Sequence, residues 1–163
     1  MSGYPLFFNF KQVIPGKGFL AIIEAKGRVL LVQEDDKWWL YGVQPGGMAA
    51  YGETVEDGLR NFGTAFKNIL LDIASESQTA DEFKRAVRDF FISIDEEDAN
   101  AWETARNELR SEKTKCPDDI GSLRKETSNF DSTIDIILIR KKDDLNIKKK
   151  DILPRDDLYQ RAA

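Results

Sequence analysis

The chain has 163 residues, the size of one ordinary domain, and 41% of them are apolar, which is enough for a hydrophobic core. Its formal net charge of −5 argues against nonspecific binding to nucleic acid or membranes through bulk charge. Histidine is absent and Cys116 is the only cysteine, which excludes histidine-dependent nucleophiles, histidine metal sites, internal disulfides and thiolate zinc sites. Any bound metal would therefore be held by carboxylates, carbonyls and water.

The sequence carries no pattern typical of a targeting or membrane segment. No apolar run approaches the ~20 residues of a membrane helix, and no basic segment leads into an apolar run near the first residue. We therefore expect a soluble, cytoplasmic chain with no membrane partner. No repeat or linker stands out, so we expect a single domain over residues 1–163.

The first third of the sequence predicts β-strands. Apolar and β-branched residues gather in four runs, at 4–10, 18–25, 28–34 and 37–43. The segment Ala25-Lys26-Gly27 between the second and third runs is typical of a hairpin turn, and Asp35-Asp36 predicts another turn. Much later, residues 132–140 (STIDIILIR) predict a buried strand.

From about Thr54 the apolar period changes to three and four, which predicts a helix with one apolar face: Val55, Leu59, Phe62, Phe66, Ile69, Leu70 and Ile73. A second helix is expected to begin with a capping box at Thr79 and Glu82, and a third with Asp95 as its N-cap. Their predicted apolar stripes are Phe83, Val87, Phe90 and Ile94, and then Ala99, Trp102, Arg106 and Leu109. We expect a polar loop at 111–130 and a short helix at 156–160.

A motif joins the last strand of the first third to the first helix. Residues 39–47 read WLYGVQPGG, and residues 52–60 read GETVEDGLR. These segments resemble the signature of the Nudix family, hydrolases of nucleoside diphosphates linked to another group, whose box reads G-x5-E-x7-R-E-U-x-E-E-x-G-U. Gly47 and Glu53 match its first two letters. The resemblance implies an α/β fold, a Nudix-like mixed β-sheet sandwich with flanking helices, to which residues 79–110 add a helical insertion.

The second half of the box is missing. Counted from Glu53, the arginine position is Asn61, and the carboxylate positions are Phe62, Ala65 and Phe66; a shift by one residue recovers Arg60 but no carboxylate. Nudix chemistry needs such carboxylates to hold Mg²⁺ or Mn²⁺. We therefore expect no catalytic residues, no metal ligands and no cofactor. In an alternative interpretation, Glu53, Glu56 and Asp57 hold a relocated Mg²⁺ or Mn²⁺, although acids in a first helical turn also simply favour the helix dipole.

The expected ligand-binding residues surround the Pro-Gly-Gly turn: Trp38, Trp39, Gly46, Gly47, Tyr51 and Arg60. One of the two adjacent tryptophans must point away from the core, because strand side chains alternate, and an exposed ring there could stack on a nucleobase or contact another subunit. The two glycines could admit a phosphate or serve only the turn.

The resemblance and the missing carboxylates together predict a degenerate, non-hydrolytic Nudix-like domain that binds a nucleotide, a nucleoside-diphosphate compound or a protein partner, with a homodimer also open. Two alternatives remain: an active pyrophosphohydrolase with a relocated carboxylate metal site, and a structural interaction module with a closed pocket. Lysine clusters near 140–142 and 148–150 do not make nucleic acid a favoured partner, given the acidic total.

Overall fold

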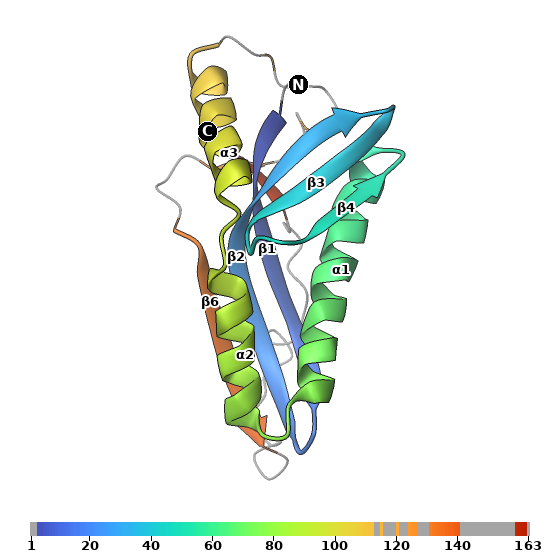
Figure 1. Cartoon of the computed structure of the whole chain (residues 1–163), viewed down its shortest axis with the longest axis vertical. Helices are drawn as coiled ribbons and strands as arrows, with labels where there is room; N and C mark the ends of the chain where they lie inside the picture. Colours follow the sequence, from blue (N-terminus) through green and yellow to red (C-terminus); the bar gives the residue numbers. More distant parts are fainter. Residues whose placement is uncertain are drawn as a thin grey trace.

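The fold was derived from a computed structural model, which describes residues 3–112, 115, 120, 124–126, 131–140 and 159–162. It is a mixed α/β fold, shown in Figure 1. The elements in chain order are β1 (Gly3–Gly16), β2 (Phe19–Glu34), β3 (Lys37–Gln44), β4 (Ala49–Gly52), α1 (Val55–Glu76), α2 (Ala80–Ile92), α3 (Glu96–Arg110), β5 (Arg124–Glu126), β6 (Thr133–Arg140) and β7 (Tyr159–Ala162).

All described strands belong to one sheet in the order β4-β3-β2-β1-β7-β5, and β6 pairs with β2 outside this path. The pairs are antiparallel except the short pair β5–β7, so the sheet is predominantly antiparallel. The long strand β2 has β1 along its whole length on one side. On its other side, the first half pairs with β6 and the second half pairs with β3.

The hairpin predicted at Ala25-Lys26-Gly27 is wrong, because β2 runs through this segment without a turn. Gly27 pairs with Phe8 of β1 in an unbroken register. At the same point, the neighbour on the other edge changes from β6 to β3, and a Cβ on Gly27 would collide with the carbonyl oxygen of Gln44. The glycine therefore admits a close backbone approach and makes no turn.

The real turns use residues that tolerate a positive φ. Lys17 and Gly18 join β1 to β2, and Gly18 has a φ of +73°. The predicted turn at Asp35-Asp36 is confirmed: the two residues have φ values of 49° and 61°, which suits a two-residue hairpin between β2 and β3. Aspartate tolerates this left-handed region better than most residues.

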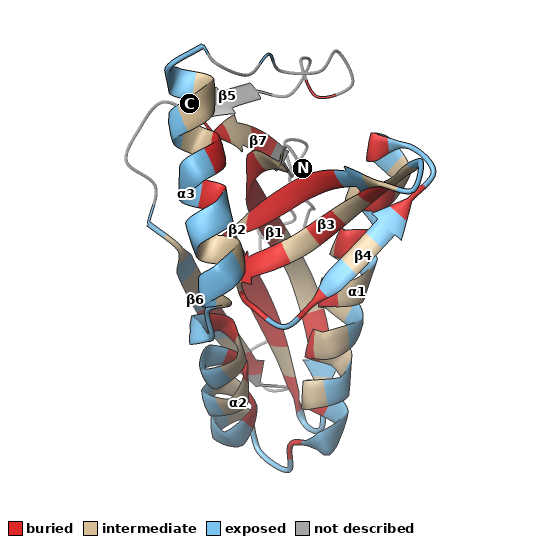
Figure 2. Cartoon of the chain, turned by 45° about the horizontal axis from the view of Figure 1, so that its top comes forward, coloured by how far each residue is buried: buried red, intermediate tan, exposed pale blue. Residues whose placement is uncertain are grey.

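Helices cover both faces of the sheet, as Figures 1 and 2 show. Helices α1 and α2 pack against one face of the sheet and form the larger hydrophobic core with it. Helix α1 contributes Phe62, Phe66 and Leu70 to this core. Helix α3 covers part of the other face, where Trp102 packs among Phe7, Leu30 and Val43. Both predicted N-caps are confirmed: the side chains of Thr79 and Asp95 accept backbone N–H bonds from the first turns of α2 and α3, and the side chain of Thr54 does the same for α1.

The predicted stripe of α2 is partly wrong. Phe83 and Val87 are buried, but the next core residue is Phe91, whereas Phe90 is half-buried and Ile94 is 48% exposed. The helix ends at Ile92, so Ile94 lies in the connection to α3 and no longer follows the helical period. The two helices α2 and α3 do occupy the interval 79–110 predicted as an insertion.

The last third departs from the sequence predictions in three places. Strand β6 confirms the strand predicted at 132–140, but Ile137 is 57% exposed, so the strand is half-buried on an edge of the sheet. Strand β5 lies inside the predicted polar loop. Gln160 belongs to β7, so a helix does not reach residue 160; the rest of that prediction, Cys116 and the lysine clusters lie outside the described residues.

Candidate functional site

The β3–β4 hairpin places its two adjacent tryptophans on opposite faces. Trp38 is 8% exposed and packs into the larger core, with its ring 6.5 Å from that of Tyr4. Trp39 is half-buried and lies on the face that α3 covers farther along the sheet. The expected alternation therefore leaves Trp39, and not Trp38, for a ligand.

Three rings form a continuous row on the outer face of this hairpin; we call Tyr41, Trp39 and Tyr51 the aromatic strip. Trp39 stacks on Tyr41 with centroids 5.9 Å apart and an angle of 10° between the rings. On its other side, Trp39 lies 4.8 Å from Tyr51, its cross-strand partner on β4. The Lys37 ammonium lies 4.8 Å from the centroid of the Tyr51 ring. Tyr51 is 45% exposed, so the strip is open to solvent at this end.

The Pro-Gly-Gly turn is held from behind by the connection between α2 and α3. The Gly46 N–H donates to the Ser93 carbonyl over 2.8 Å, and the Asp95 N–H donates to the Val43 carbonyl over 3.2 Å. Gly46 is buried and a Cβ there would collide with the backbone of Asp95, so this glycine serves close packing. Gly47 is exposed, has a φ of +75° and has open space beside it.

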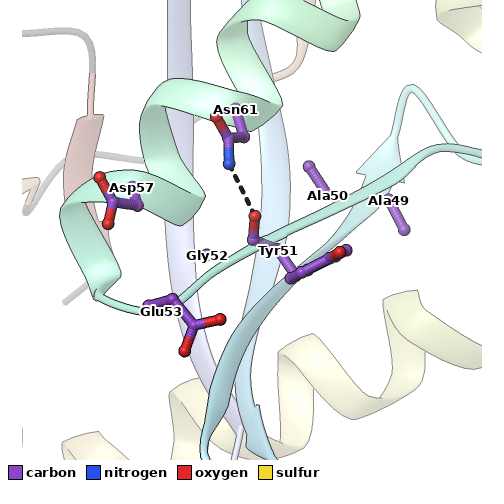
Figure 3. A pocket seen from close by; sticks show the side chains of 7 residues that line it. All are labelled: Ala49, Ala50, Tyr51, Gly52, Glu53, Asp57 and Asn61. Carbon is purple, nitrogen blue, oxygen red and sulfur yellow. Dashed lines mark hydrogen bonds between the residues drawn. The ribbon is translucent and has the colours of Figure 1, made fainter.

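A hollow of about 460 Å³ lies beside the strip, between β4 and the beginning of α1 (Figure 3). It is lined by Ala49, Ala50, Tyr51, Gly52, Glu53, Asp57 and Asn61. The Asn61 amide donates to the Tyr51 carbonyl over 2.8 Å and thereby joins the helix to the edge strand. Gly52 permits this approach, because a Cβ there would collide with Gly58. We call this the first hollow.

The acids considered for a relocated metal do not all meet in the first hollow. Glu53 and Asp57 line it, but Glu56 does not. The guanidinium of Arg60 lies 3.0 Å from an Asp57 oxygen and 3.8 Å from a Glu56 oxygen, so two of the three acids form ion pairs with this arginine. Within the described part of the chain, no group of three or more His, Cys, Asp or Glu side chains is placed to hold a metal ion.

Two phenylalanines of α1, at positions where the sequence resemblance predicted that carboxylates were missing, lie in the hydrophobic core. Phe62 and Phe66 are fully buried, and both make edge-to-face contacts with Phe8, at 5.3 and 5.0 Å between centroids. Phe66 makes a third such contact with Phe10 at 4.7 Å. Phe62 and Phe66 therefore build the hydrophobic core, and this helix face does not fit a divalent metal.

A second hollow, of about 490 Å³, lies where α3 crosses β2 and β3, and sequence analysis missed it. It is lined by Gly3, Leu30, Val32, Glu34, Tyr41, Glu97, Asp98, Ala101, Thr104, Ala105 and Glu108. The floor is apolar, and four carboxylates surround it. The acidic and small residues recur along α3 at helical spacing, but their strand partners could be found only from the fold.

Burial and neighbouring carboxylates raise two pKa values around the second hollow, those of Tyr41 and Asp98. Tyr41 donates its hydroxyl hydrogen to the Glu34 carboxylate, whose oxygens lie 3.2 and 3.3 Å away. Burial raises the pKa of this hydroxyl, and Glu34 raises it further. Burial also raises the pKa of the Asp98 carboxyl, followed by repulsion from Asp95 and Glu97. Tyr41 thus links the aromatic strip to the second hollow.

In comparisons with protein-family models, curated proteins and solved structures, nothing matches this chain. The described helices include none that is long and apolar enough to cross a membrane. The aromatic strip and its two hollows are the features of the described chain that bear on function.

Proposed function

We propose that this chain is a non-hydrolytic binding domain that keeps a Nudix-like loop and helix but has lost the metal shell. The observation that carries the proposal is the burial of Phe62 and Phe66 at the box positions. Pyrophosphate hydrolysis in such a fold depends on metal ions that activate water and neutralise charge, and two phenylalanines in the core supply neither. The same helix face that would perform catalysis stabilises the fold here.

The aromatic strip is the proposed binding surface. Its rings present flat apolar area with polar edges, and such surfaces bind planar rings or side chains of a partner. One nucleobase on a protein ring contributes on the order of 1–3 kcal/mol. A nucleotide-like molecule or a protein segment would therefore contact Trp39 and Tyr51, while Gly47 leaves open space at the neighbouring turn.

The first test is a hydrolysis assay with ADP-ribose, dinucleotides, nucleotide sugars and nucleoside triphosphates, in Mg²⁺ or Mn²⁺. We expect no turnover above that of a Glu53→Ala/Glu56→Ala/Asp57→Ala variant. The same compounds and a peptide library are then titrated against the ¹⁵N-labelled chain, in which the Trp39 indole signal should shift for the true ligand class. If neither compounds nor peptides shift it, the strip is not a binding surface.

One observation favours the second candidate, a pyrophosphohydrolase with a relocated site. Glu53 and Asp57 both line the first hollow, where a hydrated divalent ion could bind between them. Metal-dependent turnover that disappears in the triple alanine variant would establish this candidate and overturn the first. The third possibility, an interaction module with a closed pocket, predicts that Trp39→Ala leaves all binding unchanged.

A further inference from the structure

The charges around the aromatic strip differ between its two ends. At the Tyr51 end, Glu53 and Asp57 line the first hollow, but Lys37 lies over the Tyr51 ring and Arg60 pairs with Asp57, so charges of both signs are present. At the Tyr41 end, the second hollow has four carboxylates in its lining and no basic residue. A phosphate group bound at the Tyr41 end would approach carboxylates, whereas a cation would be attracted there.

The rings on this face already hold cations of the chain itself. The Lys37 ammonium lies over Tyr51 at the open end of the strip. Under α3, the guanidinium carbons of Arg28 and Arg106 each lie 5.4 Å from the centroid of Trp102. Contacts between a cation and an aromatic face are therefore the recurrent mode of binding on this side of the sheet.

We infer that the aromatic strip is a docking surface for a basic peptide segment of a partner protein, whose arginine or lysine side chains lie on the rings and reach the carboxylates of the second hollow. This inference rests on the proposed function, because it names the ligand of the same surface. The centroid separations of 5.9 and 4.8 Å limit the strip to about 11 Å, the length of about three residues of extended chain.

An extended segment suits the strip because its alternate side chains point to the same side. Guanidinium groups at every second position would contact successive rings. Their N–H donors can form bidentate hydrogen bonds with the carboxylates that line the second hollow. Glu34 and Glu97 are the acids of choice for a test, since both line the second hollow and lie on different elements.

The experiment uses the full ¹⁵N-labelled chain and three blocked peptides, GRGRGRG, GQGQGQG and GEGEGEG, with ADP-ribose as the anionic ring-bearing probe. The chain has three tryptophans, and a Trp39→Phe variant assigns their indole signals. Trp38 lies on the opposite face, and Trp102 is buried with its indole N–H donating to the Leu6 carbonyl. Their signals therefore serve as internal references.

We expect GRGRGRG alone to shift the Trp39 signal to saturation, with an affinity that falls as NaCl is added. Trp39→Ala should weaken binding about three- to thirtyfold. Glu34→Gln/Glu97→Gln should weaken it about two- to tenfold. The charge-matched control is Asp72→Asn/Glu76→Gln, two exposed acids at the far end of α1, which should bind as the natural chain does.

Other outcomes separate this inference from the proposed function. If GQGQGQG binds as tightly as GRGRGRG, or if ADP-ribose shifts Trp39 and the arginine peptide does not, the inference is wrong while the strip remains a binding surface. If the Glu34→Gln/Glu97→Gln variant binds the arginine peptide unchanged, the acidic rim is not the recognition element and the inference is also wrong. If no probe shifts Trp39, the inference falls, and the wider panel of compounds and peptides decides the proposed function.

Discussion

Replacing Phe66 with alanine tests whether the box helix really serves the core. Phe66 has no exposed surface, and its ring makes edge-to-face contacts with Phe8 and Phe10. Truncating a buried phenylalanine costs about 3–5 kcal/mol through lost transfer energy and the cavity left behind. Since a domain is stable by only about 5–15 kcal/mol, Phe66→Ala should remove about a fifth or more of the free energy of unfolding.

Urea unfolding followed by tryptophan fluorescence measures this loss, provided that the slope of the transition stays constant. The control is Asn68→Ala, an exposed position two residues along α1, which should change stability by less than about 0.5 kcal/mol. Phe66→Glu should cost more than alanine, because the carboxylate would be buried without a partner. A loss below about 1 kcal/mol for Phe66→Ala would refute the assignment of this helix face to the core.

Three further predictions concern a close approach of two strands, a helix cap and a partly buried charge. Gly27→Ala should cost about 1–3 kcal/mol in urea unfolding, because the methyl group meets the Gln44 carbonyl oxygen and the strands must separate; an unchanged midpoint would contradict the close approach. Thr54→Ala should cost about 1 kcal/mol by removing the N-cap of α1, whereas a loss near zero would mean that solvent replaces it. Burial first, and then neighbouring carboxylates, raises the folded-state pKa of Asp98 above its ordinary value of 3.8, so the folded state loses stability as pH rises between these two values. Asp98→Asn should therefore stabilise the chain at pH 7 and lose this advantage below about pH 4, as thermal unfolding at both pH values would show.

Local signals in the sequence were sufficient for the helices and one turn. The N-caps Thr79 and Asp95 could be recognised because capping depends on residues within one turn. The turn at Asp35-Asp36 could also be recognised, because turn formation likewise depends on neighbouring residues. Gly27 was misread because a glycine that ends a strand and a glycine that admits a neighbouring backbone look alike until the neighbour, Gln44, is known.

The candidate site was predictable only where it follows strand alternation. The rule that adjacent residues face opposite sides correctly required that one tryptophan leave the core, but which one depends on the register with β2 and on the position of α1. The second hollow joins Glu34 to α3, which are more than sixty residues apart in sequence. No local pattern reports such a juxtaposition.

The two backbone hydrogen bonds that join the Pro-Gly-Gly turn to the α2–α3 connection restrict how the chain could change in evolution. Gly46 and Val43 obtain hydrogen-bond partners from the connection between α2 and α3, and α3 also shields Trp102 and Phe7. A descendant that shed residues 79–110 would leave two backbone groups without those partners and uncover apolar surface on both faces of the sheet. The helical pair is thus a structural part of the motif, and its loss would require a new covering for the turn.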